Sequence, residues 1–327
     1  MVRLAGLTLL LACLAGSAIA TSPAGLLAQA PQVSAFTLDA PEAREGHAYA
    51  EGEFTLADPY GETPLLTRFK LYLADTREPA PLVLVLTPYR GETFADSGYA
   101  EALAARGLHA ALVAVPKDAY RQDADIDYID RFFVRHTLNV LALKHALLEH
   151  PASPIRVSRV GLLGSSLGAI RASILFGADR QFASAVLIMP GGDLAKLIAR
   201  TALQPIAQWR EKFLFPELQD DPFALPPEPL ESDLHAFEQQ LRPHIHIDPL
   251  DFVRPRSASQ ILFVRSESDS FVPRQNQDRL FAAYRDTSQQ APEEIPGSSL
   301  GHYATIIAVY NSDKDRIVDF LRRKLAN

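Results

Sequence analysis

Residues 160–169 read Val-Gly-Leu-Leu-Gly-Ser-Ser-Leu-Gly-Ala, with an apolar run before the motif Gly164-x-Ser166-x-Gly168 and a helical pattern after it. A sharp strand-to-helix turn of this kind strains the backbone of the middle serine and projects its hydroxyl above the sheet. Glycine is needed two positions away on either side, because a side chain there would clash with neighbouring backbone. The stretch therefore predicts that Ser166 is a nucleophile.

Two other interpretations of this stretch are a glycine-rich helix start with a capping serine and a phosphate-binding turn. A P-loop requires Gly-Lys followed by Ser or Thr, which this sequence does not contain. Ser165 cannot be the nucleophile in this register, because its flanking positions would be Leu163 and Leu167. The turn would also aim the Leu167 N–H, at the start of the helix, toward a developing oxyanion.

Apolar runs without polar alternation indicate strands that are buried on both faces. Such runs alternate along the chain with helical patterns, which indicates a mostly parallel sheet with helices on both faces, an α/β fold. The predicted strands are 82–87, 110–115, 160–163, 185–189 and 261–265, and the predicted helices are 97–105, 129–149, 167–176, 274–284 and 313–325. An antiparallel hairpin is predicted before them, with arms 50–56 and 67–73 around the turn signal at 58–61.

One segment, residues 194–256, breaks this alternation. It contains Trp209 and many prolines but no convincing strand pattern, and it is too long for an ordinary connection between two strands. We interpret it as an inserted helical cap; a second independent domain is the alternative. The predicted organisation is a leader at 1–20 and one α/β domain at 21–327 that carries this insertion.

The elbow motif and the order of the elements resemble the α/β-hydrolase superfamily over about residues 65–327. In that family the nucleophile is followed along the chain by an acid after a late strand, and then by a histidine in a loop before the final helix. Residues 261–273 are similar to the family's acid loop, because a buried strand is followed by Asp269 and then by Val-Pro before a helix. His302 follows Gly301, after enough chain for one helix and one short strand, and precedes the terminal helix. The resemblance implies a triad of Ser166, Asp269 and His302.

Other residues compete for these roles. Glu267 lies two positions before Asp269, and Asp193 follows the preceding strand, where some members of the family place the acid. The remaining histidines are structural candidates only: His47, His109, His136, His145, His150, His235, His244 and His246.

The second oxyanion donor is expected in the loop Thr-Pro-Tyr-Arg-Gly at 87–91. Many members of the family have His-Gly there, so this chain departs from the pattern. The loop resembles that of the cocaine-esterase and X-prolyl-peptidase branch, which implies that Tyr89 donates through its phenol or its backbone N–H. A tyrosine that packs under the loop is the alternative. Arg90 can bind a substrate carboxylate or be a surface charge.

Composition excludes several classes of partner and cofactor. The 327 residues carry a formal charge of −7, which argues against nucleic acid as a partner. The single cysteine, Cys13, cannot build a disulfide framework or an iron–sulfur cluster within the chain. His244 and His246 alternate as metal ligands can, but together with Asp248 they are only weak evidence for a metal site. We therefore expect no cofactor and no metal.

The first twenty residues have the composition of a secretory signal peptide, with Arg3, an apolar stretch and an Ala18-x-Ala20 cleavage pattern. A permanent membrane helix is the alternative, although the apolar stretch is short for a span. A third interpretation is a lipoprotein box that ends at Cys13. Export to the periplasm or the medium is expected, with no membrane span in the mature chain.

These observations predict an exported serine hydrolase that cleaves small carboxylic esters through an acyl-enzyme on Ser166. A peptidase or amidase of the same fold is the second hypothesis, motivated by the Tyr89 loop and the cap. A non-catalytic binding protein on this fold is the third. The sequence does not indicate the acyl group, the leaving group or the oligomeric state.

Overall fold

The computed structural model describes residues 25, 27, 31, 33–89, 91–115, 124–218, 226–255 and 258–326. The predicted leader at 1–20, with Cys13, lies outside the described residues, and so does Arg90. Within the described part, ten strands form one sheet in the order β1-β3-β4-β6-β5-β7-β8-β9-β10, with β2 paired to β3. The strands from β6 to β10 along this order are parallel, whereas β1 to β4 pair in antiparallel fashion and β4 pairs antiparallel with β6. The predicted α/β fold with a mostly parallel sheet is confirmed.

The strands are β1 (Val33–Leu38), β2 (Glu42–Arg44), β3 (His47–Leu56), β4 (Leu65–Ala74), β5 (Ala80–Leu86), β6 (His109–Val113), β7 (Val157–Ser165), β8 (Phe182–Ile188), β9 (Ile261–Arg265) and β10 (Glu293–Pro296). The α-helices are α2 (Phe94–Ala104), α3 (Tyr128–Glu149), α4 (Leu167–Ala178), α5 (Leu194–Arg200), α6 (Gln204–Leu214), α7 (Glu231–Leu241), α8 (Arg274–Ser288) and α9 (His302–Leu325). Short 3₁₀ helices are η2 (Pro216–Leu218), η3 (Arg242–His244), η4 (Pro249–Phe252) and η5 (Ala258–Gln260).

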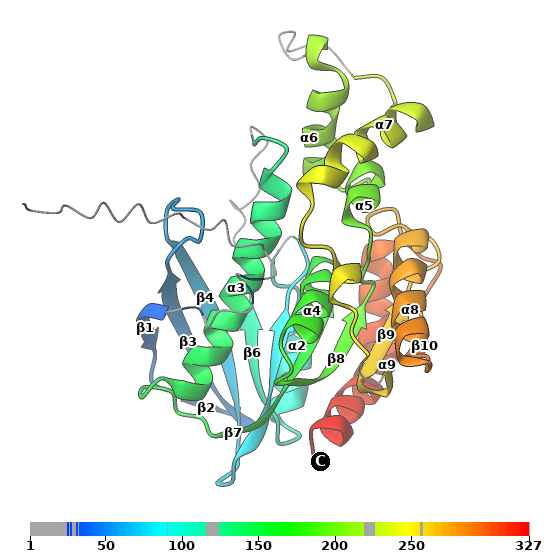
Figure 1. Ribbon diagram of the computed structural model, residues 1–327. Coiled ribbons are helices and arrows are strands. Elements are labelled where there is room, and N and C mark those ends of the chain that lie inside the picture. Colours follow the sequence, from blue (N-terminus) through cyan, green and yellow to red (C-terminus); the bar gives the residue numbers. More distant parts are fainter. Residues whose placement is uncertain are drawn as a thin grey trace, which may run out of the picture.

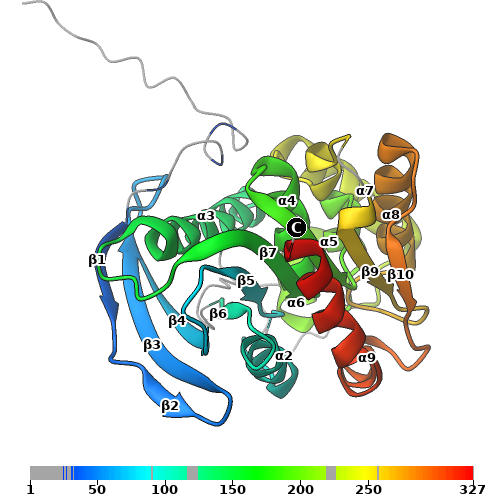
Figure 2. The same ribbon diagram turned by 90° about the horizontal axis from the view of Figure 1, so that it is seen from below.

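Helices cover both faces of the sheet. Viewed along the strands, α3, α4 and α8 lie on one face, and α2 and α9 lie on the other (Figure 2). Alternate residues of β5 serve the two faces: Leu82, Leu84 and Leu86 join the core under α3 and α4, while Val83 and Val85 join the core under α2 and α9. This double burial is the reason that the strand has no polar alternation.

Between β8 and β9, the described residues form helices and no strand. Figure 1 shows α5, α6 and α7 together at one end of the molecule, beyond the carboxyl end of β8. Trp209 of α6 is buried, and its indole N–H donates to the carbonyl of Ala124 at 3.0 Å, in the segment that precedes α3. The helices are therefore packed against the rest of the molecule through a specific contact.

The predicted boundaries differ from the observed ones by a few residues at several elements, and the largest difference is in the terminal helix. The terminal helix was expected to begin at Asp313, but α9 begins at His302, so the histidine lies in the first turn of the helix and not in a loop before it. Exposed Tyr303 and Ile307 interrupt the amphipathic pattern of the first turns, which conceals the helix in the sequence. Among the described helices, none is long and apolar enough to cross a membrane.

Candidate active site

Ser166 lies at the turn between β7 and α4, with φ 55° and ψ −121°. A positive φ in a residue with a side chain is strained and is found mainly at functional positions. The two glycines of the motif permit the turn: a Cβ on Gly164 would lie 2.4 Å from the carbonyl oxygen of Gly168, and one on Gly168 would lie 2.0 Å from that of Leu86. This geometry agrees with the elbow predicted from the sequence.

Ser165 has a different role in the structure. It is the last residue of β7, and its hydroxyl donates to Asp96 Oδ1 at 3.4 Å. Asp96 is 1% exposed, and its other carboxylate oxygen accepts from the N–H and the hydroxyl of Thr93 at the start of α2. Burial raises the pKa of Asp96 to about 6, and the hydrogen bonds from Thr93 and Ser165 act in the opposite direction. Asp96 therefore connects the strand that ends at the elbow to the helix that follows the Tyr89 loop.

Asp96 was not among the residues selected from the sequence. The available signal was Thr93-x-x-Asp96, a capping-box pattern that marks the start of α2. Nothing local to that pattern indicates the contact with Ser165, which lies 69 residues away along the chain.

Asp269 follows β9 and is oriented by its own loop. One carboxylate oxygen, Oδ1, accepts from the backbone N–H groups of Phe271 at 2.8 Å and Val272 at 2.9 Å. The other oxygen, Oδ2, lies 2.7 Å from Nδ1 of His302. A carboxylate held in this way fixes the tautomer and orientation of the imidazole. Asp269 and His302, which were predicted as partners, are therefore in contact.

His302 is buried at the N-terminal end of α9, and its ring lies 4.9 Å, between centroids, from that of Phe271. Phe271 also lines a pocket that contains Ser166, which places the histidine and the serine at the same edge of the sheet. Among the described residues, the ring of His302 is hydrogen-bonded to Asp269 and none of its hydrogen bonds reaches the Ser166 hydroxyl. Catalytic hydrogen bonds in enzymes without substrate are often long. A hydrogen bond between His302 and the Ser166 hydroxyl is therefore a proposal.

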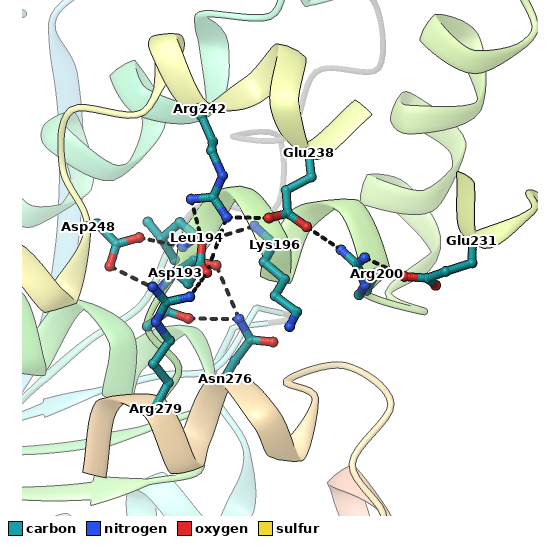
Figure 3. Close-up of polar contacts among 11 residues, drawn as sticks. Asp193, Leu194, Lys196, Arg200, Glu231, Glu238, Arg242, Asp248, Asn276 and Arg279 are labelled. Atoms are coloured by element: carbon teal, nitrogen blue, oxygen red, sulfur yellow. Dashed lines mark hydrogen bonds and ion pairs between the residues drawn. The ribbon is translucent and has the colours of Figure 1, made fainter. Parts of the chain in front are cut away.

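Asp193, the competing acid, is engaged elsewhere. It is buried, lies in left-handed backbone at φ 59°, and pairs with Arg242 at 3.1 Å and with Arg279. Figure 3 shows that Arg242 also reaches Glu238, which pairs with Arg200. The network connects the end of β8 to α5, α7, η3 and α8. The other competitor, Glu267, is exposed.

Tyr89 and Leu167, the two candidate oxyanion donors, line the same pocket as Ser166. The N–H of Leu167 belongs to the first turn of α4, where no intrahelical acceptor exists and the helix dipole favours negative charge. Tyr89 is half-buried in the loop after β5, where Gly91, at φ 87°, closes a turn onto Pro88.

The residues weighed for a metal are engaged with separate partners. His244 Nδ1 lies 2.5 Å from Asp127, the backbone N–H of His246 donates to Asp130, and Asp248 accepts from the N–H groups of Asp193 and Leu194. In the described ranges, no group of three or more His, Cys, Asp and Glu residues is placed to hold a metal ion.

No family model and no curated protein matches this sequence. Solved structures do match the fold. An acetyl xylan esterase from Paenibacillus sp. R4 superposes with a TM-score of 0.59 at 14% identity, over 90% of this chain and 91% of that chain. Acetyl xylan esterase 1 from Thermoanaerobacterium sp. JW/SL YS485 gives a TM-score of 0.58 at 16% identity, over 90% and 88% of the two chains.

An acylaminoacyl peptidase from Pyrococcus horikoshii is also similar, with a TM-score of 0.52 at 13% identity over 89% of this chain and 50% of that chain. These similarities, together with the sheet order and the elbow, show that the chain has the α/β-hydrolase fold. The resemblance drawn from the sequence is confirmed at the level of the fold.

Proposed function

We propose that this protein is a serine hydrolase that cleaves carboxylic esters through an acyl-enzyme on Ser166. The observation that carries the proposal is the strained serine elbow at the same sheet edge as a buried Asp269–His302 pair. The similarity to two acetyl xylan esterases supports ester hydrolysis only through the fold.

In the proposed reaction, the Ser166 hydroxyl oxygen attacks the ester carbonyl carbon while His302 accepts the hydroxyl proton. Asp269 stabilises the resulting imidazolium. The carbonyl oxygen becomes an oxyanion that accepts hydrogen bonds from the N–H of Leu167 and from Tyr89. The imidazolium then protonates the departing alkoxide, and the acyl group remains on Ser166. A water molecule, deprotonated by His302, then attacks the acyl carbon. The bond from that carbon to the Ser166 oxygen breaks, the imidazolium returns its proton to this oxygen, and the acid is released.

A direct test compares purified wild type with Ser166→Ala, Asp269→Ala and His302→Ala on p-nitrophenyl butyrate. We expect Ser166→Ala and His302→Ala to lower kcat by about 10⁴-fold or more, because the nucleophile and its base act as one unit. His235→Ala, an exposed histidine of α7, is the matched control and should retain full activity. Undiminished turnover by Ser166→Ala would refute the assignment.

An amidase or peptidase activity is the second candidate. Two observations favour this activity: the similarity in fold to an acylaminoacyl peptidase, and the resemblance of the Tyr89 loop to that of X-prolyl peptidases. Aminoacyl p-nitroanilides tested at the same enzyme concentration separate the two candidates, since an esterase should turn them over far more slowly than the esters.

We also propose that the chain is exported and that residues 1–20 are removed. Expression of the full chain should yield a protein that begins at Thr21, as read by N-terminal sequencing. A lipoprotein would instead begin at a lipidated Cys13, and its processing would be blocked by globomycin. A product that retains Met1 would contradict both forms of the proposal.

A further inference from the structure

The pocket that contains Ser166 is lined by several separate parts of the chain. Its walls include Phe132 and Phe133 of α3, Ile198 of α5 and Ile206 of α6, and Phe271 of the acid loop. Ser166, Leu167 and Tyr89 also line it. The pocket therefore adjoins the residue on which the proposed acyl-enzyme would form.

The lining is apolar. Among the described residues that line the pocket, none carries a charge. The hydroxyl of Thr201 donates to the carbonyl of Phe271 at 2.8 Å and accepts from the N–H of Leu203 at 3.1 Å, so its only proton is already used within the protein. A charged group that entered this space would lose its hydration without gaining an oppositely charged partner among these lining residues.

The pocket lies on the acyl side of the proposed reaction. His302 must be near the leaving group, because it protonates the departing oxygen. The described lining includes both candidate oxyanion donors, Leu167 and Tyr89, but not His302. The leaving group therefore departs toward His302, and the acyl chain is left to fill the apolar pocket.

The pocket is also small. Its volume is about 40 Å³. A space of this size takes the first carbons of an acyl chain and has no room for a long chain.

Resting on the proposed ester hydrolysis, we propose that this enzyme selects short, uncharged acyl groups. Each additional buried methylene should raise kcat/KM about fourfold from acetate to the optimum. Beyond the optimum, overpacking should lower it, so p-nitrophenyl octanoate should be hydrolysed at least about fivefold less efficiently than the pentanoate.

The first experiment measures kcat/KM for p-nitrophenyl esters from acetate to decanoate. A matched pair tests charge: the pentanoate against the hemiglutarate, which replaces the terminal methyl with a carboxylate. We expect the hemiglutarate to be at least about 100-fold poorer, because its carboxylate would be buried without a partner. A chain-length profile without an optimum, or hemiglutarate turnover within tenfold of the pentanoate, would overturn the inference.

Two variants at Ile206 test the wall itself. Ile206 is half-buried, so neither change removes a central core side chain. Ile206→Ala should move the optimum to longer chains by about two carbons, and Ile206→Phe should move it to shorter ones. Gln208→Ala, on an exposed position of the same helix, is the control and should keep the wild-type profile. An optimum that does not move in either Ile206 variant would contradict the assignment of the pocket.

Labelling with a small fluorophosphonate, run in parallel, separates the two levels of the proposal. Labelled protein with a flat chain-length profile would overturn only the acyl preference. Protein that neither reacts with the probe nor hydrolyses any ester would overturn the proposed function, and the acyl preference with it.

Discussion

Ser166 adopts a backbone conformation that costs on the order of 1–3 kcal/mol relative to an unstrained residue. The neighbouring glycines make this conformation possible, and the backbone N–H of Ser166 donates to Ile188 of the adjacent strand at 2.8 Å. Ser166 and Asp269 could be predicted from the sequence, because the elbow and the acid loop are local patterns whose residue types follow from local geometry. Asp96 was missed because its partner Ser165 is distant in the chain.

Replacing Tyr89 by Phe tests the second oxyanion donor. If the phenol stabilises the oxyanion, kcat should fall by about 10²–10³ with little change in KM, because the interaction is stronger in the transition state than in the ground state. Tyr60→Phe, in the turn between β3 and β4, serves as the control. An unchanged kcat would exclude the phenol and leave the backbone N–H of Tyr89 as the candidate donor.

Because burial raises the pKa of Asp96, we predict that the free energy of unfolding depends on pH. Its folded pKa of about 6 lies above the unfolded value of 3.8, so between these values the folded state binds the proton more tightly. The contribution of this group to stability is therefore complete below pH 3.8, and it is lost as the pH rises to about 6. The loss amounts to about 3 kcal/mol.

Urea unfolding of wild type and Asp96→Asn from pH 4 to pH 7 measures this effect. The free energy of unfolding of the variant, relative to wild type, should increase by about 2 kcal/mol over that range, because Asn does not titrate and the unfolded carboxyl is already partly deprotonated at pH 4. Asp75→Asn, at an exposed position, should give a flat difference. A flat difference for Asp96→Asn as well would show that its carboxylate is not destabilised by burial.

The elements between β8 and β9 determine which side chains face the pocket. Helix α5 supplies Leu197 and Ile198 to the pocket wall, and the network around Asp193 holds the start of this helix. We propose that this segment, predicted as residues 194–256, is the cap. The helical structure of this segment could be predicted from the sequence. The ion pairs around Asp193 could not be predicted, because they join charged residues that are far apart in the chain.

Arg242→Gln should loosen this segment. The change leaves buried Asp193 and Glu238 with one fewer cation each, although Arg279 and Arg200 remain. Because Arg242 is partly exposed, we expect a loss of about 1–2 kcal/mol in the free energy of unfolding, with an increase in KM. Arg254→Gln, at an exposed position near η4, is the control. Equal stability of the two variants in urea unfolding would contradict a role for the network.

Edge strands were the elements hardest to predict. β10, at 293–296, contains two glutamates and a proline, so it has no apolar run that would mark a strand. β1 and β2 lie at the opposite side of the sheet, where several of their side chains are exposed. The central strands were predicted because burial on both faces requires apolar residues throughout.

At the scale of the whole molecule, the parallel strands carry Ser166, Asp269 and His302 to one edge of the sheet. The three residues follow β7, β9 and β10, whose carboxyl ends meet at that edge because these strands are parallel. Helix α9, which begins at His302, packs on the face that also carries α2, and Arg106 pairs with Asp315 of α9 at 2.7 Å. The α/β class could be predicted from the sequence, whereas the pocket depends on how separate elements pack together.

The identity of the nucleophile is the central claim, and adduct mapping tests it most directly. Wild-type protein is treated with a fluorophosphonate and digested, and the modified residue is located by mass spectrometry; Ser165→Ala is the matched control for the neighbouring serine. We predict one adduct on Ser166 in wild type and in Ser165→Ala, and none in Ser166→Ala. An adduct on any other residue of the wild type, or undiminished labelling of Ser166→Ala, would contradict the account.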